Sequence, residues 1–208
     1  MKLYLASNNA HKAAELASLA ARDGLGVEIV SARAAGGMPA VAEDTGTFAG
    51  NARKKTRALC AVLAARSTGP GHADAWVLAD DSGLEVDALA GAPGVESANY
   101  AGTGATDAAN LAKLLAALHG VPDEKRTARF YCVLALAGRN GEDHLFEGFC
   151  EGRLTREARG GAGFGYDPLF IPEGGTRTFA EMGAAEKNGF SHRARAWAGL
   201  AEWLRGRK

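Results

Sequence analysis

The sequence is poor in several features that would assign it to a class at once. Its three cysteines, Cys60, Cys132 and Cys150, are odd in number and form no CxxC pair, which is typical of reduced core thiols in a cytosolic protein. No apolar run approaches the length of a membrane span. The N-terminus turns polar at Ser7, too soon for a secretory signal peptide. We therefore expect a cytoplasmic protein with no membrane partner.

An excess of either charge is also missing. Lys plus Arg and Asp plus Glu both number 24, which argues against generic binding to nucleic acid or to a membrane surface, so any phosphate site must be local. No fixed-period repeat is evident, and only Ser67–Asp74 (STGPGHAD) resembles a flexible insert. The 208 residues, 47% of them hydrophobic, fit one domain over residues 1–208, with room for two lobes around a cleft.

The glycine-rich segment Gly160–Leu169 (GGAGFGYDPL) matches neither the P-loop pattern GxxxxGK[ST] nor a dinucleotide fingerprint after a strand. Its glycines let the backbone approach a ligand closely. Phe164 and Tyr166 stand between these glycines, and such rings can stack on a base or pack in a core. Both interpretations stay open on these residues alone.

The stretch Leu78–Tyr100 carries the strongest chemical signal. Ala75–Ala79 (AWVLA) predicts one short buried strand, which ends on Asp80 and Asp81 and is followed by Ser82. Acidic residues at the end of a buried strand are costly unless a cation meets them. Mg²⁺ is one such cation, since it takes oxygen ligands and keeps waters that a substrate phosphate can replace. The alternative is an ordinary loop, in which one Asp caps backbone amides and the other is solvated.

The N-terminal segment predicts an anion site. A strand over Lys2–Ala6 runs directly into Ser7, Asn8 and Asn9, which open a helix to about Ala21. The expected inner face of this helix holds Ala13, Leu16, Ala17 and Ala20. A helix start presents backbone N–H groups and the positive end of the helix dipole. Lys12 lies in the first turn, where the dipole disfavours a cation, so it is easier to explain if it meets an anion. The alternative is an ordinary β–α turn with a solvated lysine.

A second group of charged residues follows a strand over Gly26–Ser31. Glu43 and Asp44 precede a helix over Phe48–Arg66, and Thr47 can cap that helix. The expected core side of the helix holds Phe48, Ala52, Leu59 and Leu63. Its first turns carry several basic residues, Lys55 among them. These form either a solvated face or, with the acidic residues before them, a site for a metal and a polyphosphate.

The second half of the chain completes a mixed sheet. The expected elements are a helix over Asp107–His119, strands over Ala128–Ala137, His144–Cys150 and Gly152–Thr155, a capping box at Thr178 and Glu181, and a last helix capped by Ser191. The last two strands are too close in sequence for a crossover helix, so neighbouring strands there are expected to be antiparallel. Lys187, His192 and Arg193 favour a reader of a phosphate or a base edge, although a lone histidine is more often structural.

Five motifs occur together and in order. They are SNNAHK at Ser7–Lys12, E-x4-F-x2-NA-x2-K at Glu43–Lys55, ADDSGLEVDAL-x-GAPG-x2-SA-x-Y at Ala79–Tyr100, GAGFGYDPLF at Gly161–Phe170 and EK-x4-HR at Glu186–Arg193. This set resembles the inosine triphosphate pyrophosphatase family over nearly the whole chain. Gly50 and Thr56 depart from the residues that the family often has there, and Ser67–Asp74 looks like an extra loop. None of these departures removes a proposed site residue.

The resemblance implies a fold and an activity. It implies an α/β fold with an elongated mixed sheet flanked by helices, two lobes and a central active-site cleft. It implies a homodimer with one Mg²⁺-dependent site per subunit. The implied reaction converts noncanonical purine nucleoside triphosphates, such as ITP, dITP and XTP, to the nucleoside monophosphate and pyrophosphate.

The resemblance also implies a role for each motif residue. Ser7, Asn8, Asn9, Ala10, His11, Lys12 and Lys55 would bind the triphosphate, with Ser82 beside them on the substrate. Glu43 and Asp81 would hold Mg²⁺, with Asp44 as an alternative to Glu43, and Asp81 would accept the proton of the attacking water. Phe164, Gly165, Tyr166, Asp167, Lys187, His192 and Arg193 would bind the nucleoside end.

Two other functions remain open. A septum-inhibitor-like nucleotide pyrophosphatase has a similar architecture and could prefer modified pyrimidines, and the EK-x4-HR segment is the discriminating feature. A nucleotide-sensing domain would bind without turnover, against which the presence of Asp81, Glu43 and Lys12 argues.

Overall fold

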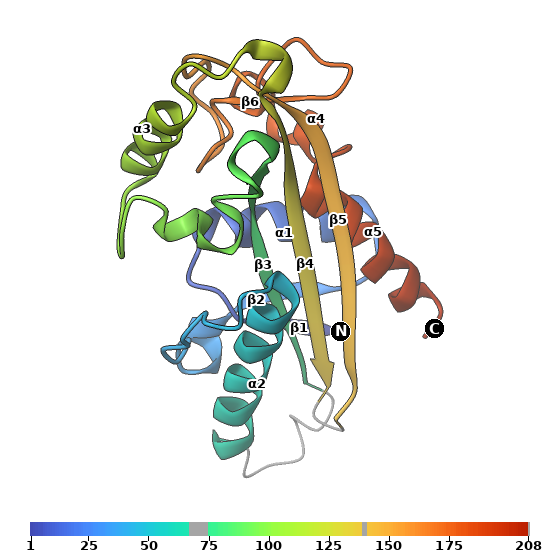
Figure 1. Ribbon diagram of the computed structural model, residues 1–208. Helices are drawn as coiled ribbons and strands as arrows, with labels where there is room; N and C mark the ends of the chain where they lie inside the picture. The colour runs from blue at the N-terminus through green and yellow to red at the C-terminus, as the bar shows by residue number, and fades with distance from the viewer. Residues whose placement is uncertain (67–74, 139–140, 208) are drawn as a thin grey trace. The chain divides into compact units, whose positions relative to one another are not determined.

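The fold is α/β, built on one mixed six-stranded sheet flanked by helices (Figure 1). The computed structural model describes residues 1–66, 75–138 and 141–207, so the Ser67–Asp74 loop lies outside the described residues. The strand order is β2-β1-β3-β4-β5-β6. The strands are β1 Lys2–Leu5, β2 Glu28–Ser31, β3 Trp76–Val86, β4 Thr127–Gly138, β5 Asp143–Leu154 and β6 Phe170–Pro172. β1 is parallel to β2 and β3, whereas β5 is antiparallel to β6, so the predicted mixed sheet is confirmed.

The described helices are α1 Ala10–Arg22, α2 Phe48–Arg66, α3 Asp107–Ala117, α4 Ala184–Lys187 and α5 His192–Arg205. Three of them, α1, α2 and α3, start where a side chain accepts from an early backbone N–H group. Asn9 caps α1, Thr47 accepts from the Gly50 amide at the start of α2, and Thr106 caps α3. The predicted capping box of Thr178 and Glu181 forms around a short 3-10 turn. Further 3-10 turns span Ala32–Ala35, Asp87–Leu89, Gly94–Asn99 and Asp123–Lys125.

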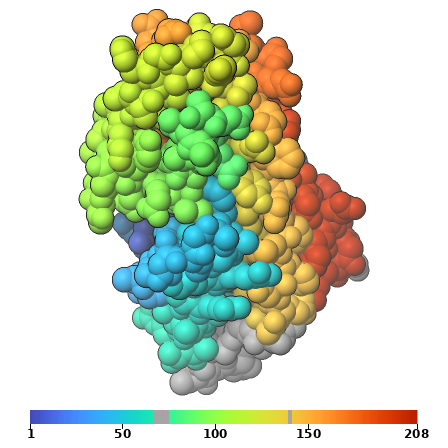
Figure 2. All heavy atoms as spheres, in the orientation of Figure 1, coloured from blue at the N-terminus to red at the C-terminus, as the bar shows by residue number. Residues whose placement is uncertain are grey.

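The chain divides into two compact units. Unit 1 comprises Met1–Asp81, Cys132–Gly148 and Arg193–Lys208, and unit 2 comprises Ser82–Tyr131 and Phe149–His192. β3, β4 and β5 therefore each contribute residues to both units. On the face shown in Figure 2, α2 and the segment before it form much of the surface of unit 1, and α3 with the turns before it forms much of the surface of unit 2.

Each unit has its own hydrophobic core. In unit 1, α1 and α5 pack on one face of the strands, through Leu16 and Leu19 of α1, Trp197 and Leu200 of α5, and Leu78 of β3. α2 lies on the other face of these strands (Figure 1). The core of unit 2 gathers Leu84, Leu114, Leu118, Phe130, Phe170 and Phe179. Burying these side chains stabilises each unit by about 25 cal/mol for every Å² of apolar surface removed from water.

Three of the expected elements need correction. β3 does not end before Asp80, but continues through Asp81 to Val86. The two strands expected over His144–Thr155 are one continuous strand, β5. The buried face of α1 includes Leu19 in place of the expected Ala17, which is exposed. This face is therefore rotated about the helix axis by part of a turn from the expected one. The core side expected for α2 is confirmed.

Two predicted absences can be compared with the described residues. Cys60, Cys132 and Cys150 all lie among them and form no disulfide. Within residues 1–66, 75–138 and 141–207, no helix combines the length and apolarity that crossing a membrane requires.

Candidate active site

The turn between β1 and α1 is closed by its own side chains. Ser7 Oγ accepts from the Asn9 amide at 3.1 Å, and Asn9 Oδ1 accepts from the Lys12 amide at 3.1 Å. These two hydrogen bonds fix the entry into the helix and satisfy two of its early N–H groups. The side chain of Lys12 leaves this first turn and reaches Asp80 of β3, with 2.5 Å between Nζ and Oδ1. The lysine is therefore held by an ion pair rather than solvated.

Asp80 and Asp81 are adjacent on β3 and contact different helices. Successive side chains of a strand point to opposite faces of the sheet. Asp80 meets Lys12 of α1 and Arg193 at the start of α5, whereas Asp81 meets Lys55 of α2 at 2.6 Å. Both aspartates are almost completely buried, with 1% and 4% exposure. Protein side chains therefore supply the cations that these buried carboxylates need, on both faces of the sheet.

The two carboxyl groups differ in proton affinity. Burial raises the pKa of Asp81 to about 6, although the charge of Lys55 acts in the opposite direction. Burial acts on Asp80 as well, but the charges of Arg193 and Lys12 outweigh it and hold the pKa of Asp80 well below its usual range. Two carboxylates whose environments separate their pKa values in this way take different chemical roles. Asp80 is a permanent anion, and Asp81 is suited to exchange a proton near neutral pH.

Glu43 and Asp81 converge on a single cation. Lys55 Nζ lies 2.7 Å from Glu43 Oε2 and 2.6 Å from Asp81 Oδ1, and these two carboxylates raise the pKa of Lys55 against the effect of burial. Asp44 instead pairs with Lys54 on the exposed side of α2. Of the two candidate carboxylates, the geometry therefore places Glu43 with Asp81.

This arrangement fits a magnesium ion. Asp81 Oδ2 is buried and has no hydrogen-bond partner in the described part of the chain. Carboxylate oxygens of this kind are the ligands that Mg²⁺ takes, usually one or two of them together with waters and substrate phosphate. In residues 1–66, 75–138 and 141–207, no cluster of three or more His, Cys, Asp or Glu side chains could form a cage for a metal made by protein alone. A site with two carboxylates is thus the arrangement to test.

The glycine-rich segment lies in unit 2 and is pinned by two carboxylates. Asp167 Oδ2 accepts from the Phe164 amide at 3.0 Å, and Asp107 Oδ2 accepts from the Gly165 amide at 2.6 Å. Tyr166 is 4% exposed, and its hydroxyl donates to Ser97 O at 2.8 Å. For Tyr166 the structure therefore shows core packing. Phe164 is only half-buried and remains the candidate ring for stacking on a base.

Lys187 forms a buried ion pair beneath this segment. Its Nζ lies 2.6 Å from Asp167 Oδ2, and both side chains are at most 5% exposed. The same Nζ lies 5.1 Å from the centre of the Phe164 ring. A cation over an aromatic face is attracted by the ring. The ion pair thus connects α4 to the segment that carries Phe164.

The last two predicted residues, His192 and Arg193, lie in different units. In unit 2, the buried His192 ring stacks on Phe130, with 4.7 Å between ring centres. In unit 1, the Arg193 guanidinium donates to Asp80 and to Glu15 of α1. These contacts do not test whether either residue binds a nucleoside, so that role stays a prediction. Ser82, the first residue of unit 2, is half-buried on β3.

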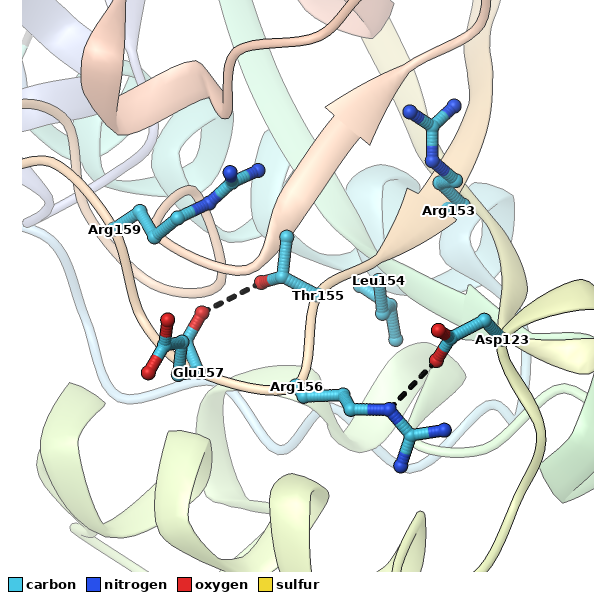
Figure 3. Close-up of a pocket in the computed structure, with 7 residues that line it drawn as sticks. All are labelled: Asp123, Arg153, Leu154, Thr155, Arg156, Glu157 and Arg159. Atoms are coloured by element: carbon cyan, nitrogen blue, oxygen red, sulfur yellow. Dashed lines mark hydrogen bonds and ion pairs between the residues drawn. The ribbon is translucent and has the colours of Figure 1, made fainter.

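A surface cavity of about 300 Å³ in unit 2 does not coincide with any predicted site residue. It is lined by Asp123, Arg153, Leu154, Thr155, Arg156, Glu157 and Arg159 (Figure 3). Arg156 pairs with Asp123 at 2.8 Å, and Arg153 donates to a backbone carbonyl. Figure 3 shows the three guanidinium groups pointing in different directions, so they do not converge on a ligand.

Comparison with known proteins assigns the family. A family model described as the Ham1 family matches residues 3–203. The chain belongs to the Ham1 family. It is 59% identical over 209 residues to the dITP/XTP pyrophosphatase of Opitutus terrae, with 99% of each chain covered. It is 52% identical over 196 residues to the dITP/XTP pyrophosphatase of Desulforamulus reducens, with 94% of this chain and 92% of the other covered.

Solved structures of Ham1 proteins agree with this fold. The HAM1 protein of Coxiella burnetii matches with a TM-score of 0.84 and 38% identity, covering 99% of both chains. The Ham1 protein of Staphylococcus aureus matches with a TM-score of 0.82 and 33% identity over the full length of both chains. The α/β fold expected from the sequence motifs is therefore confirmed.

The structure of this Ham1-family chain also adds residues that the motifs did not single out. Glu15 follows Lys12 by three positions, so both lie on one face of α1, and it pairs with Arg193. Cys132 Sγ lies 3.4 Å from Asp80 Oδ2. The spacing of Lys12 and Glu15 could have signalled that both side chains lie on one face of the helix, whereas nothing near Cys132 in the sequence pointed to Asp80.

Proposed function

We propose that this chain hydrolyses noncanonical purine nucleoside triphosphates, such as ITP, dITP and XTP, to the nucleoside monophosphate and pyrophosphate. The observation that carries the proposal is the pair Asp80 and Asp81, in which a permanently charged carboxylate adjoins one with a pKa of about 6. Each meets a lysine from a helix, Lys12 or Lys55. The names of the relatives, dITP/XTP pyrophosphatases, support the same reaction.

The proposed chemistry follows from charge. A nucleoside triphosphate brings several negative charges, which must be offset before water can attack. Lys12 and Lys55 offset part of this charge, and the backbone N–H groups of the Ser7–Lys12 turn bind phosphate oxygens beside the positive end of α1. Asp81 orients one water and takes its proton. The water adds across the α–β phosphoanhydride bond, and pyrophosphate leaves.

Glu43 and Asp81 would hold magnesium in this proposal. When bound, Mg²⁺ polarises phosphoryl oxygens and stabilises negative charge on the leaving pyrophosphate. The same two carboxylates hold Lys55, which would lie beside the phosphates. The cofactor, a homodimeric state and a cytoplasmic location are carried over from the resemblance and from the cysteine usage, and they belong to the proposal.

The residues proposed for the nucleoside end are carried over from the resemblance. Phe164 would stack on the base, the Gly165 region would bring backbone close to it, and Lys187 and His192 would supply donors at the base edge. Asp167 would act by holding both Lys187 and the Phe164 amide. Tyr166 would fix the segment from within the core rather than touch the substrate.

A substrate panel tests the proposed function. Pyrophosphate release is measured for ITP, dITP, XTP, GTP, ATP and a set of modified pyrimidine triphosphates, with Mg²⁺ and with a chelator. We expect turnover of the 6-oxopurine triphosphates that stops on chelation and returns with Mg²⁺. Preference for a modified pyrimidine would favour the septum-inhibitor-like alternative. Binding of all substrates without release of pyrophosphate would favour a nucleotide sensor.

Base selection should disfavour ATP strongly. The 6-oxo group of hypoxanthine accepts hydrogen bonds from lysine, arginine or amide donors, whereas the 6-amino group of adenine sets donor against donor. Each buried donor left unpaired costs about 1–3 kcal/mol, so two such groups give at least tenfold discrimination. The measurement is kcat/KM for ITP and ATP at equal Mg²⁺. Equal values would contradict a site that reads the 6-oxo group.

The activity should also fall in mild acid. The base must be deprotonated, and burial raises the pKa of Asp81 to about 6, so kcat/KM falls tenfold per pH unit below that value at low Mg²⁺. A bound cation favours the carboxylate, so the acidic limb should move to lower pH as Mg²⁺ is increased. The profile is measured with ITP from pH 4.5 to 9. A flat profile down to pH 5 at low Mg²⁺ would remove Asp81 as the base.

A further inference from the structure

Asp80 is the centre of a buried charge network in unit 1. Its Oδ1 lies 2.5 Å from Lys12 Nζ, and its Oδ2 lies 2.7 Å from Arg193 Nε and 3.4 Å from Cys132 Sγ. Arg193 also donates to Glu15. The two cations and two anions balance. The network joins β3 to α1, α5 and β4 within unit 1.

The burial within this network is uneven. The side chains of Asp80 and Arg193 are 0% and 1% exposed, whereas Lys12 is 15% exposed. The lysine ammonium therefore lies at the edge of the network, and the carboxylate behind it is fixed by partners that solvent does not reach. A buried carboxylate held in this way keeps one position, since moving it would leave Arg193 with an uncompensated charge.

We propose that Asp80 is a positioning residue, which holds the Lys12 ammonium where it meets the triphosphate. The inference rests on the proposed function, because it concerns how the phosphate-binding lysine of that reaction is placed. An ammonium has three donors in a flexible arrangement, and its long stem loses much rotamer freedom when fixed. Asp80 removes that freedom before the substrate arrives, which lowers the cost of binding.

The same geometry gives Arg193 a role through Asp80. Arg193 donates to Asp80 with Nε at 2.7 Å and with Nη2 at 3.4 Å, and its Nη1 donates to Glu15. Three guanidinium nitrogens are thus directed at the two carboxylates. In this arrangement Arg193 orients Asp80, and Asp80 orients Lys12, so a defect in Asp80 should affect all triphosphates alike, whatever their base.

A double-mutant cycle tests the link between Asp80 and Lys12. The variants are Asp80→Asn, Lys12→Met and the double variant, with kcat and KM measured for ITP and ATP. We expect Asp80→Asn to raise KM by roughly 10- to 100-fold, with a smaller change in kcat, because a misplaced binding group weakens substrate capture. If Asp80 acts through Lys12, the double variant is no worse than Lys12→Met alone. Additive losses would overturn the proposal, and so would a changed ITP/ATP ratio in Asp80→Asn.

A second measurement reads the position of Lys12 without turnover. Acetylation by acetic anhydride is followed at each lysine by peptide mass spectrometry, with the exposed Lys2 as the reference. Lys12 should react several-fold faster in Asp80→Asn than in the wild type. An unchanged rate would overturn the proposal even if the wild type proved inactive on every triphosphate, an outcome that would independently refute the proposed function.

Two further variants serve as controls for these measurements. If Asp80→Asn does not fold, Asp80→Glu keeps the charge while moving the carboxylate, and it should give the same pattern to a smaller extent. Asp143→Asn is the matched control, since Asp143 is a partly exposed carboxylate of unit 1 that pairs with Arg53. It should change neither KM nor the acetylation of Lys12, and an equal effect there would show that the result is not specific to Asp80.

Discussion

Asp81→Asn should lower kcat for ITP by about 10²–10⁴-fold, and by more if magnesium is lost as well, while the protein stays folded. The amide keeps the size of the side chain but can neither accept the proton of water nor serve as an anionic ligand. Folding should not suffer. Since burial raises the pKa of Asp81, its charge lowers the free energy of unfolding above pH 6, and the neutral amide removes that cost.

The measurements are steady-state pyrophosphate release and thermal unfolding at pH 7.5. The melting temperature should equal that of the wild type or exceed it, because Lys55 keeps Glu43 as a partner. Asp44→Asn is the matched variant, since Asp44 pairs with Lys54 away from Asp81 and should matter much less. A folded Asp81→Asn protein with a near wild-type rate would remove Asp81 from the mechanism. A loss as large in Asp44→Asn would return Asp44 to the metal site.

Lys187→Met should destabilise the chain by about 3–5 kcal/mol, because it leaves Asp167 as a buried charge without its cation. Asp167 also accepts from the Phe164 amide, so the segment that carries Phe164 should loosen at the same time. The free energy of unfolding is measured by urea titration, and KM for ITP is measured at a temperature where the variant is still folded. Both quantities should worsen.

A matched set of variants separates the ion pair from its surroundings. Lys125→Met removes an exposed lysine of unit 2 and should change the free energy of unfolding by no more than about 0.5 kcal/mol. The double variant Lys187→Met with Asp167→Asn removes both charges and should recover part of the stability lost in Lys187→Met. A double variant less stable than Lys187→Met would contradict the uncompensated charge as the cause.

Local patterns predicted much of the fold. The helix over Phe48–Arg66 begins and ends where the apolar spacing and the Thr47 cap placed it, and its core side follows the period of 3.6. β3 did not follow its local pattern. Two consecutive aspartates predicted the end of the strand, because a buried charge is tolerated only when a cation meets it. The cation here is Arg193, and no short window of sequence shows that Arg193 lies near Asp80.

The candidate site was predictable in its residue types but not in its pairing. The motifs named Lys12, Lys55, Glu43 and Asp81, and the structure pairs Lys12 with Asp80 and Lys55 with the other two. Which lysine serves which aspartate depends on which face of β3 each helix covers, and this is a property of the packed chain. The aromatic residues of the glycine-rich segment differ for the same reason, since only packing assigns Tyr166 to the core and leaves Phe164 half-exposed.

Because Asp80 and Asp81 are adjacent on β3, insertions and deletions in this strand should act differently from substitutions. Side chains alternate along a strand, so a single-residue deletion or insertion between Trp76 and Asp80 exchanges the faces of the two carboxylates. Asp80 would then lie beside Lys55, and Asp81 would take its place in the network of Lys12 and Arg193. Substitutions in this segment can lower the activity to different degrees. An insertion or deletion of an odd number of residues should abolish the activity. A deep insertion and deletion scan of β3 should therefore show an even–odd pattern of survival.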